Sequence, residues 1–181
     1  VFFRESETVE LKETVVDDVK KEIIAFANCE GGKLYIGVRD DGTVIGVDNP
    51  DRVALQISNM VRDAIKPDIT MFLHYETLEI EDKKIVAVEI QRGTDRPYYI
   101  AKKGLSPMGV YVRQGCFSVP AADNAIRSMI KETDGDRFET MRSLKQELTF
   151  DITKKEFEQR NVEFGLKQMQ TLKMLDYNGI Y

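Results

Sequence analysis

The side chains best suited to chemistry in this sequence are basic residues gathered in one stretch. Between residues 91 and 130, six basic residues stand against two acidic ones, whereas the whole chain of 181 residues carries a formal net charge of −5. The basic residues are Arg92, Arg96, Lys102, Lys103, Arg113 and Arg127, and the acidic ones are Asp95 and Asp123. Such side chains hold phosphate oxygens or form ordinary surface ion pairs. The negative total argues against a protein that coats nucleic acid through bulk electrostatics.

Histidine and cysteine are too scarce for several common kinds of site. The chain has one histidine, His74, and two cysteines, Cys29 and Cys116. These numbers exclude an all-Cys/His zinc site and a disulfide scaffold, and a His-dependent triad would have to use His74. His74 lies in a strand-like run, which favours a structural role. The scarcity of cysteines favours a reduced, cytoplasmic setting. We expect no membrane partner, because no apolar run approaches the roughly 20 residues that span a bilayer.

The first part of the chain predicts strands around a helix. The expected elements are a strand over 8–12 with one wet face, a helix over 17–28, a strand over 33–38 and a returning strand over 44–47. Asp41-Gly42 supplies the hairpin turn. Gly31-Gly32 follow a helix and precede a strand, the reverse of the order in a phosphate-binding loop. We therefore interpret these glycines as a helix stop.

The second part predicts further strands, and the basic residues fall among them. The expected elements are a helix over 50–65 capped by Asn49, strands over 71–80 and 85–90, a hairpin of 98–101 with 110–113, and a helix beginning near Ser118 and Pro120. Lys102-Lys103-Gly104 starts the long tip of that last hairpin. The basic charge is thus expected at a sheet edge and in a loop.

Beyond residue 135 the sequence becomes helical and strongly charged. Apolar residues predict three helices, one around Phe138, Met141 and Leu144, one around Phe157, and one that includes Phe164, Met169, Leu172 and Leu175. The predicted fold class is α+β, a mixed or antiparallel sheet packed with helices and followed by a short helical C-terminal segment.

The combination of these motifs resembles one known family, the Schlafen AlbA-type domain of bacterial regulators and Schlafen proteins. The resemblance covers roughly residues 3–131. The matching residues are Glu5-Ser6, Val9-Glu10-Leu11-Lys12, Ala25-Phe26-Ala27-Asn28, Gly31-Gly32, Ile36 to Gly42, Ile45-Gly46, Arg96-Pro97-Tyr98-Tyr99 and Tyr111 to Gly115. The motifs are individually weak, but their shared order is specific.

This resemblance implies a nucleic-acid-binding domain with a regulatory role, and DNA rather than RNA as its partner. In the Schlafen branch it also implies RNA cleavage by three acidic residues, which map onto Glu5, Glu10 and Asp40. As an endoribonuclease, the chain would use them to hold Mg²⁺ or Mn²⁺. The simpler interpretation is that Glu5 and Glu10 are solvated strand residues and that Asp40 sets the turn.

We interpret the chain as a DNA-binding part of a bacterial transcriptional regulator, with residues 1–135 as its nucleic-acid-binding domain. Residues 136–181 would be a helical extension that starts a longer C-terminal region. The predicted phosphate contacts are Lys12, Arg92, Arg96, Lys102, Lys103 and Arg113, with Tyr98, Tyr99 and Tyr111 as stacking or packing residues. Open sheet edges allow a homodimer, and a protein-interaction or oligomerisation module is a further alternative.

Overall fold

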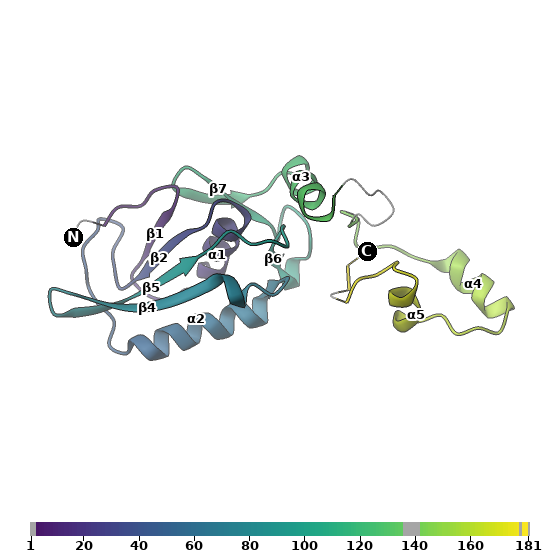
Figure 1. Cartoon of the computed structure of the whole chain (residues 1–181), viewed down its shortest axis with the longest axis horizontal. Coiled ribbons are helices and arrows are strands. Elements are labelled where there is room, and N and C mark those ends of the chain that lie inside the picture. Colours follow the sequence, from purple (N-terminus) through teal and green to yellow (C-terminus); the bar gives the residue numbers. More distant parts are fainter. Residues whose placement is uncertain (1–2, 136–141, 178, 181) are drawn as a thin grey trace. The chain divides into compact units, whose positions relative to one another are not determined.

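The chain forms two compact units, Val1–Met129 and Ile130–Tyr181. The computed structural model describes residues 3–135, 142–177 and 179–180. The strands lie in the first unit and are followed by helices, so the predicted α+β class is confirmed (Figure 1). In the described part of the chain, none of the helices combines the length and the apolar character needed to cross a membrane.

A four-stranded mixed sheet forms the centre of the first unit. Its spatial order is β1 (Val9–Lys12), β2 (Gly32–Ile36), β5 (Lys83–Ile90) and β4 (Leu73–Ile80). β1 runs parallel to β2, and the other two pairings are antiparallel. β4 and β5 are the predicted pair of strands joined by a polar turn. The predicted strands at 8–12, 33–38, 71–80 and 85–90 are confirmed to within a few residues.

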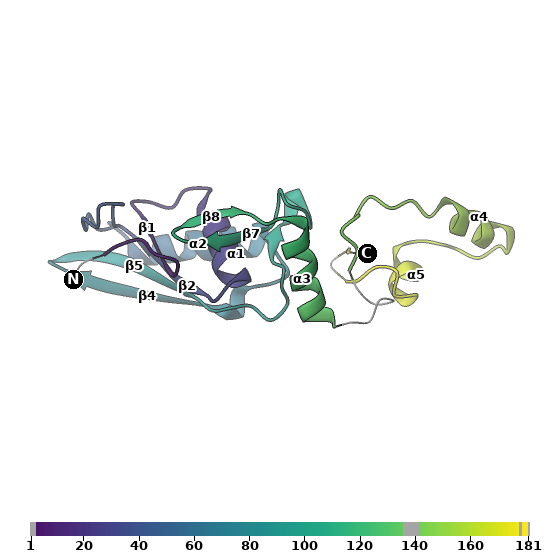
Figure 2. The ribbon, with the colours of Figure 1, turned by 90° about the horizontal axis from the view of Figure 1, so that it is seen from above.

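Two helices, α1 (Val19–Asn28) and α2 (Pro50–Ala64), pack on one face of this sheet (Figure 2). Their buried side chains form one core with alternate residues of β2 and β5: Ile23, Phe26, Ile57, Val61, Leu34, Ile36, Val86 and Val88. α2 starts as predicted, because the Asn49 side chain accepts a hydrogen bond from the Arg52 backbone N–H at 2.9 Å. Apolar residues at helical spacing therefore predict both helices and their buried faces.

Gly31 and Gly32 end α1, as predicted. The Gly31 N–H donates to the Phe26 carbonyl at 2.9 Å, and Gly31 has a positive φ of 82°. This is the left-handed conformation that commonly closes a helix. A side chain on Gly32 would meet the Phe26 ring, with the nearest ring carbon 2.4 Å from a Cβ at that position. The pair lets the chain reverse tightly from α1 into β2.

The predicted hairpin after β2 is only partly formed. β2 ends at Ile36, and the returning segment contributes an isolated bridge between Val38 and Val44 rather than a strand over 44–47. Gly37 interrupts the strand with a φ of 99°, and its carbonyl accepts hydrogen bonds from the backbone of Ile45 and Gly46, both at 2.9 Å. A positive φ at the end of a strand interrupts the hydrogen-bond ladder between strands. The prediction of a returning strand over 44–47 was therefore wrong. Val38 and Val44 still bury against Leu11 and Ile85 on the second face of the sheet.

The predicted hairpin of 98–101 with 110–113 is wrong. β6 (Tyr99–Ile100) pairs with β3 (Ile65–Lys66), and β7 (Tyr111–Gln114) pairs with β8 (Phe117–Pro120). The residues predicted to start a helix near Ser118 belong to β8 instead. Two 3-10 turns complete this part, η1 (Thr70–Phe72) and η2 (Ala101–Lys103). The second turn carries the adjacent lysines Lys102 and Lys103.

Among the described residues, the strands are followed by three helices, α3 (Asp123–Asp134), α4 (Asp151–Gln159) and α5 (Leu166–Thr171). Phe157 lies in α4 and Met169 in α5, as predicted, whereas Leu172 and Leu175 follow α5. The rings of Phe157 and Phe164 pack with their centroids 4.9 Å apart. Of the helix predicted around Phe138, Met141 and Leu144, the first two residues lie outside the described residues and Leu144 is not helical.

Candidate nucleic-acid interface and its buried carboxylates

Glu10 lies on the face of the sheet that α1 covers. The register of β1 sets Glu10 beside Leu34 and Lys12 beside Ile36, and both β2 residues belong to the core beneath the helices. Glu10 is 5% exposed, so the prediction that it is a solvated residue on a wet strand face is wrong. Its Oε1 accepts from the Lys12 ammonium, and its Oε2 accepts from Arg113 Nη1 at 2.9 Å. Burial of this carboxylate therefore comes with two cationic partners.

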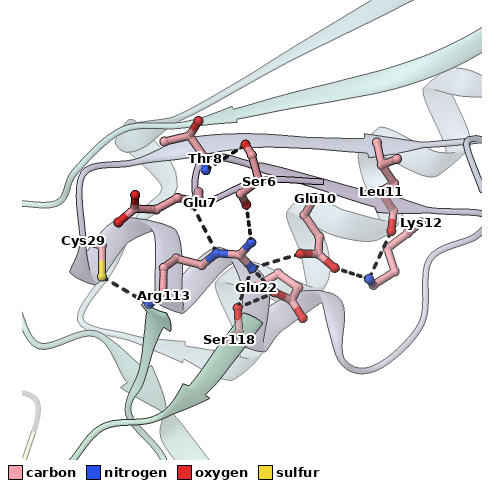
Figure 3. A network of polar contacts seen from close by, with 10 residues as sticks. All are labelled: Ser6, Glu7, Thr8, Glu10, Leu11, Lys12, Glu22, Cys29, Arg113 and Ser118. Atoms are coloured by element: carbon pink, nitrogen blue, oxygen red, sulfur yellow. Dashed lines mark hydrogen bonds and ion pairs between the residues drawn. The ribbon is translucent and has the colours of Figure 1, made fainter. Parts of the chain in front are cut away.

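Arg113 is the centre of the buried polar network that Figure 3 shows. Its side chain is 1% exposed. Besides Glu10, Nη1 donates to Glu22 Oε2 and Ser118 Oγ, both at 3.0 Å. Nη2 donates to the Ser6 carbonyl at 2.8 Å, and Nε donates to the Glu7 carbonyl at 3.3 Å. The guanidinium thus ties together β1, α1, β8 and the segment before β1.

Two further contacts hold Arg113 against α1. Its guanidinium carbon lies 4.6 Å from the centroid of the Phe26 ring, a cation–π contact. Its backbone N–H donates to Cys29 Sγ at 3.2 Å. With donors directed at protein acceptors and a side chain closed off from solvent, Arg113 is placed to hold the fold rather than to reach a phosphate.

Two carboxyl groups around this network, those of Glu22 and Glu5, have raised pKa values. Burial raises the pKa of Glu22, opposed by a hydrogen bond from Ser118, and the charge of Glu10 raises it further. Burial also raises the pKa of Glu5, and the charges of Glu10 and Asp40 add to that effect. The three acidic residues that the resemblance marks therefore share one electrostatic neighbourhood.

Arg96 also points inward. It is 8% exposed, and its Nη1 donates to the Asn28 carbonyl at 2.8 Å. The Asn28 side chain accepts from the Tyr98 N–H at 2.7 Å and donates to the carbonyls of Tyr98 and Tyr111 at 2.9 and 3.0 Å. Asn28 and Arg96 together fasten the end of α1 to β6 and β7. The three tyrosines of this region are all buried: Tyr98, Tyr99 and Tyr111. They are therefore packing residues and do not stack on nucleic-acid bases.

Lys102 and Lys103 present the most accessible basic charge in the predicted set. Both are exposed on η2, and within the described residues neither forms an ion pair through its ammonium. Arg92 is exposed but pairs with Glu30, and the two residues line a shallow pocket of about 410 Å³. Lys12 is partly exposed and held by Glu10. The six predicted phosphate contacts therefore do not form one surface.

Lys20 and Lys21, at the start of α1, were missed by sequence reasoning. The pKa of Asp17, just before α1, is lowered mainly by the hydrogen bond from Lys20, and the charges of Lys20, Lys21 and Lys102 add to this effect, so all three lysines act on one carboxylate. Lys21 lies over the Tyr111 ring, 5.9 Å from its centroid, and pairs with Asp18 at 2.6 Å. The only sequence signal was the Lys-Lys pair itself, because its nearness to Lys102 depends on the fold.

Comparison with known proteins identifies the family. The Schlafen, AlbA_2 family model matches residues 5–122. The chain belongs to the Schlafen AlbA_2 family. Among solved structures, the DIP2311 protein from Corynebacterium diphtheriae is similar over 96% of this chain and 34% of its own, with 13% identity and a TM-score of 0.54. The chain thus spans about a third of that protein, and the likeness shows the fold alone.

A second solved structure is the N-terminal domain of an ATP-dependent DNA helicase RecG-related protein from Nitrosomonas europaea. It shares 20% identity over 67% of this chain and 83% of its own, with a TM-score of 0.48. No curated protein matches the sequence. The family assignment therefore depends on the Schlafen AlbA_2 match.

The three acidic residues of this AlbA_2 chain do not fit a divalent cation. Among the described residues, no group of three His, Cys, Asp or Glu side chains is placed to hold a metal ion. Both oxygens of Glu10 already accept from cationic side chains. A cation bound to Glu10 would be repelled by the positive charges of Lys12 and Arg113. Two positive unit charges 4 Å apart repel by about 4 kcal/mol at an effective dielectric constant of 20, and a divalent cation doubles that repulsion. Asp40 does not set the turn either, because Asp41 Oδ1 accepts the Thr43 N–H at 2.8 Å.

Proposed function

We propose that this Schlafen AlbA_2 domain binds nucleic acid, DNA rather than RNA, as part of a bacterial transcriptional regulator in the cytoplasm. The observation that carries the proposal is the exposed Lys102-Lys103 pair on η2, for which the described residues show no ion pair. Lysine ammonium groups without a protein anion keep their charge available for phosphate oxygens. Membership of the family supports the same function.

The proposed interface consists of Lys102 and Lys103, with Lys20 and Lys21 beside them. Four of the basic residues, Lys12, Lys20, Lys21 and Arg92, are secondary contacts in this proposal, because each must exchange a carboxylate for a phosphate. Arg96 and Arg113 support the interface from inside by fixing β6 and β7. Non-specific contact through lysines gives binding that weakens steeply with salt.

The test replaces Lys102 and Lys103 together by glutamate and follows binding to labelled duplex DNA by fluorescence anisotropy over a series of salt concentrations. We expect weaker binding and a slope of log K against log salt that is flatter by about two, because each lost phosphate contact removes about 0.9 from the slope. The matched control replaces the exposed pair Lys154 and Lys155 of α4 by glutamate, which changes net charge equally. A salt slope that stays the same in the η2 variant would contradict the assignment.

The same assay with labelled tRNA decides between the two nucleic acids. Tighter binding of tRNA than of duplex DNA at equal salt would contradict the DNA part of the proposal. Binding of neither would contradict the proposal as a whole and favour a protein-interaction module.

We further propose that residues 1–135 form the nucleic-acid-binding domain and 136–181 a helical extension. β1 and β4 are the outer strands of the sheet, so their backbone edges offer a route to a homodimer. Light scattering would support the dimer by a mass twice the 20.7 kDa of the chain, and a monomer mass would contradict it.

A further inference from the structure

We infer that Lys12 and Arg113 supply from within the chain the positive charge that a divalent cation would supply to a carboxylate cluster, so that Glu10 is a structural ion-pair partner and not a metal ligand. The inference does not rest on the proposed nucleic-acid binding, in which Lys12 is only a secondary contact that a phosphate would have to draw away from Glu10. It assigns Glu10 and Arg113 the role of fastening the start of the chain to the β7–β8 hairpin.

The pairing of charges in the cluster carries the first step. Each oxygen of Glu10 accepts from a different cation, Lys12 on Oε1 and Arg113 on Oε2. Arg113 also pairs with Glu22, whose carboxylate accepts in addition from the Ser118 hydroxyl. The half-buried Lys12 and the buried Arg113 thus neutralise the carboxylates of this region. A hard cation would have to displace side chains that are already in hydrogen-bonding geometry.

Burial carries the second step. The Glu10 side chain is 7% exposed and the Arg113 side chain 1%, so neither end of their ion pair opens broadly to solvent. Breaking such a pair leaves an unpaired charge in a low-dielectric surrounding, which costs far more than breaking an exposed pair. The network is therefore a stable structural feature rather than an empty binding site.

The backbone contacts of Arg113 carry the third step. Its guanidinium donates to the carbonyls of Ser6 and Glu7, which precede β1, while its own strand pairs with β8. Arg113 and Ser6 are 107 residues apart in the sequence. One side chain thus joins the first segment of the fold to a late hairpin, and Glu10 fixes that side chain through its charge.

The experiment compares the full chain with its Glu10→Gln variant in EDTA and in Mn²⁺. Thermal unfolding measures stability, and the electron paramagnetic resonance signal of aqueous Mn²⁺ measures binding. We expect Glu10→Gln to lower Tm by roughly 5 °C or more in both conditions, because Arg113 loses a buried partner. We expect Mn²⁺ to change Tm of neither protein. Glu13→Gln is the control, since Glu13 forms only a half-exposed pair with Arg39 at 3.5 Å.

Two results would overturn the inference. One is a Glu10→Gln protein as stable in EDTA as the unmodified chain. The other is Mn²⁺ binding by the unmodified chain that Glu10→Gln abolishes. If Glu10→Gln does not fold, Asp40→Asn replaces it in the binding assay, because Asp40 is exposed and its loss would abolish binding only if the trio held the metal. If the unmodified chain and the variant bind Mn²⁺ equally well, the binding site lies elsewhere in the protein. That result agrees with the inference.

Discussion

A few buried polar side chains hold the first unit together. Asn28, Arg96 and Arg113 each contact backbone groups from distant parts of the chain, and all three are buried. Buried polar groups are costly unless they are hydrogen-bonded, so each of these residues is favourable only in the complete arrangement. Their presence makes the packing of α1 against β6 and β7 specific rather than merely apolar.

Asn28 offers a test of this view. Replacing Asn28 by alanine leaves the Tyr98 N–H and the carbonyls of Tyr98 and Tyr111 without their side-chain partner. We expect a loss of about 3 kcal/mol in the free energy of unfolding, because unsatisfied buried groups cost about 1–3 kcal/mol each and relax only in part. Urea denaturation measures the loss. Asn59→Ala on α2 is the control, since the Asn59 side chain accepts a hydrogen bond from the exposed Arg62 side chain. An equal loss in both variants would contradict the role of Asn28.

The sequence predicted the accessible part of the candidate interface better than the buried part. Lys102 and Lys103 are exposed, as a lysine pair in a polar loop usually is. Arg113 was assigned to phosphate from its type and its motif, yet its partners Glu10 and Ser6 are more than 100 residues away. Residue type indicates what a side chain can bind. Which partner it meets depends on contacts that only the fold creates.

At the scale of elements, the connection from α1 to β2 fixes how the helix lies on the sheet. Gly31 turns the chain with a positive φ, and its Cα faces β5 so closely that a Cβ would lie 2.5 Å from the Ile90 carbonyl oxygen. The helix end that carries Asn28 and Cys29 is therefore held against the sheet. The position of both residues under β7 follows from this tight turn.

Gly31→Ala and Gly115→Ala form a matched pair of variants. Both glycines have positive φ, 82° and 60°, so alanine costs about 1–2 kcal/mol at either position through backbone strain. Only Gly31 adds a collision with backbone, because a Cβ on Gly115 meets nothing within 4 Å. We expect Gly31→Ala to be less stable than Gly115→Ala by at least about 2 kcal/mol in urea denaturation. An equal loss of stability in the two variants would mean that β5 moves to accommodate the new Cβ. The turn would then not fix the position of the helix.

The elements themselves were largely predictable, whereas their pairing was predictable only in part, as for β4 with β5. Apolar periodicity located α1, α2, β4 and β5, because each of these signals is local. The partners of β6 and β7 were predicted wrongly for two different reasons. β6 pairs with a segment far away in the sequence, whereas β7 pairs with β8 across the two-residue turn Gly115-Cys116, and the residues of β8 had been assigned to a helix start. β6 joins β3 across 33 residues, from Lys66 to Tyr99, and no local signal marks that pairing.

At the scale of the whole molecule, the proposed interface and its supports all belong to the first unit. The mixed sheet, both covering helices and the Arg113 network lie within Val1–Met129. The limit between the units falls inside α3, which runs from Asp123 to Asp134. A domain that keeps α3 whole must extend past residue 129, and for this reason we propose the limit at 135.

Truncation of the chain tests that limit and the location of binding together. We expect a protein ending at Gly135 to unfold cooperatively and to keep the salt slope of DNA binding, because it retains Lys102, Lys103 and the whole of α3. A protein ending at Met129 cuts α3 before Ile130, which is 1% exposed, and we expect it to lose about 2 kcal/mol or more of stability. Denaturation and anisotropy on the two proteins and the full chain measure both effects. If the protein ending at Gly135 folds but no longer binds DNA, the helical extension contributes to the interface, and the lysines of η2 are not sufficient for it.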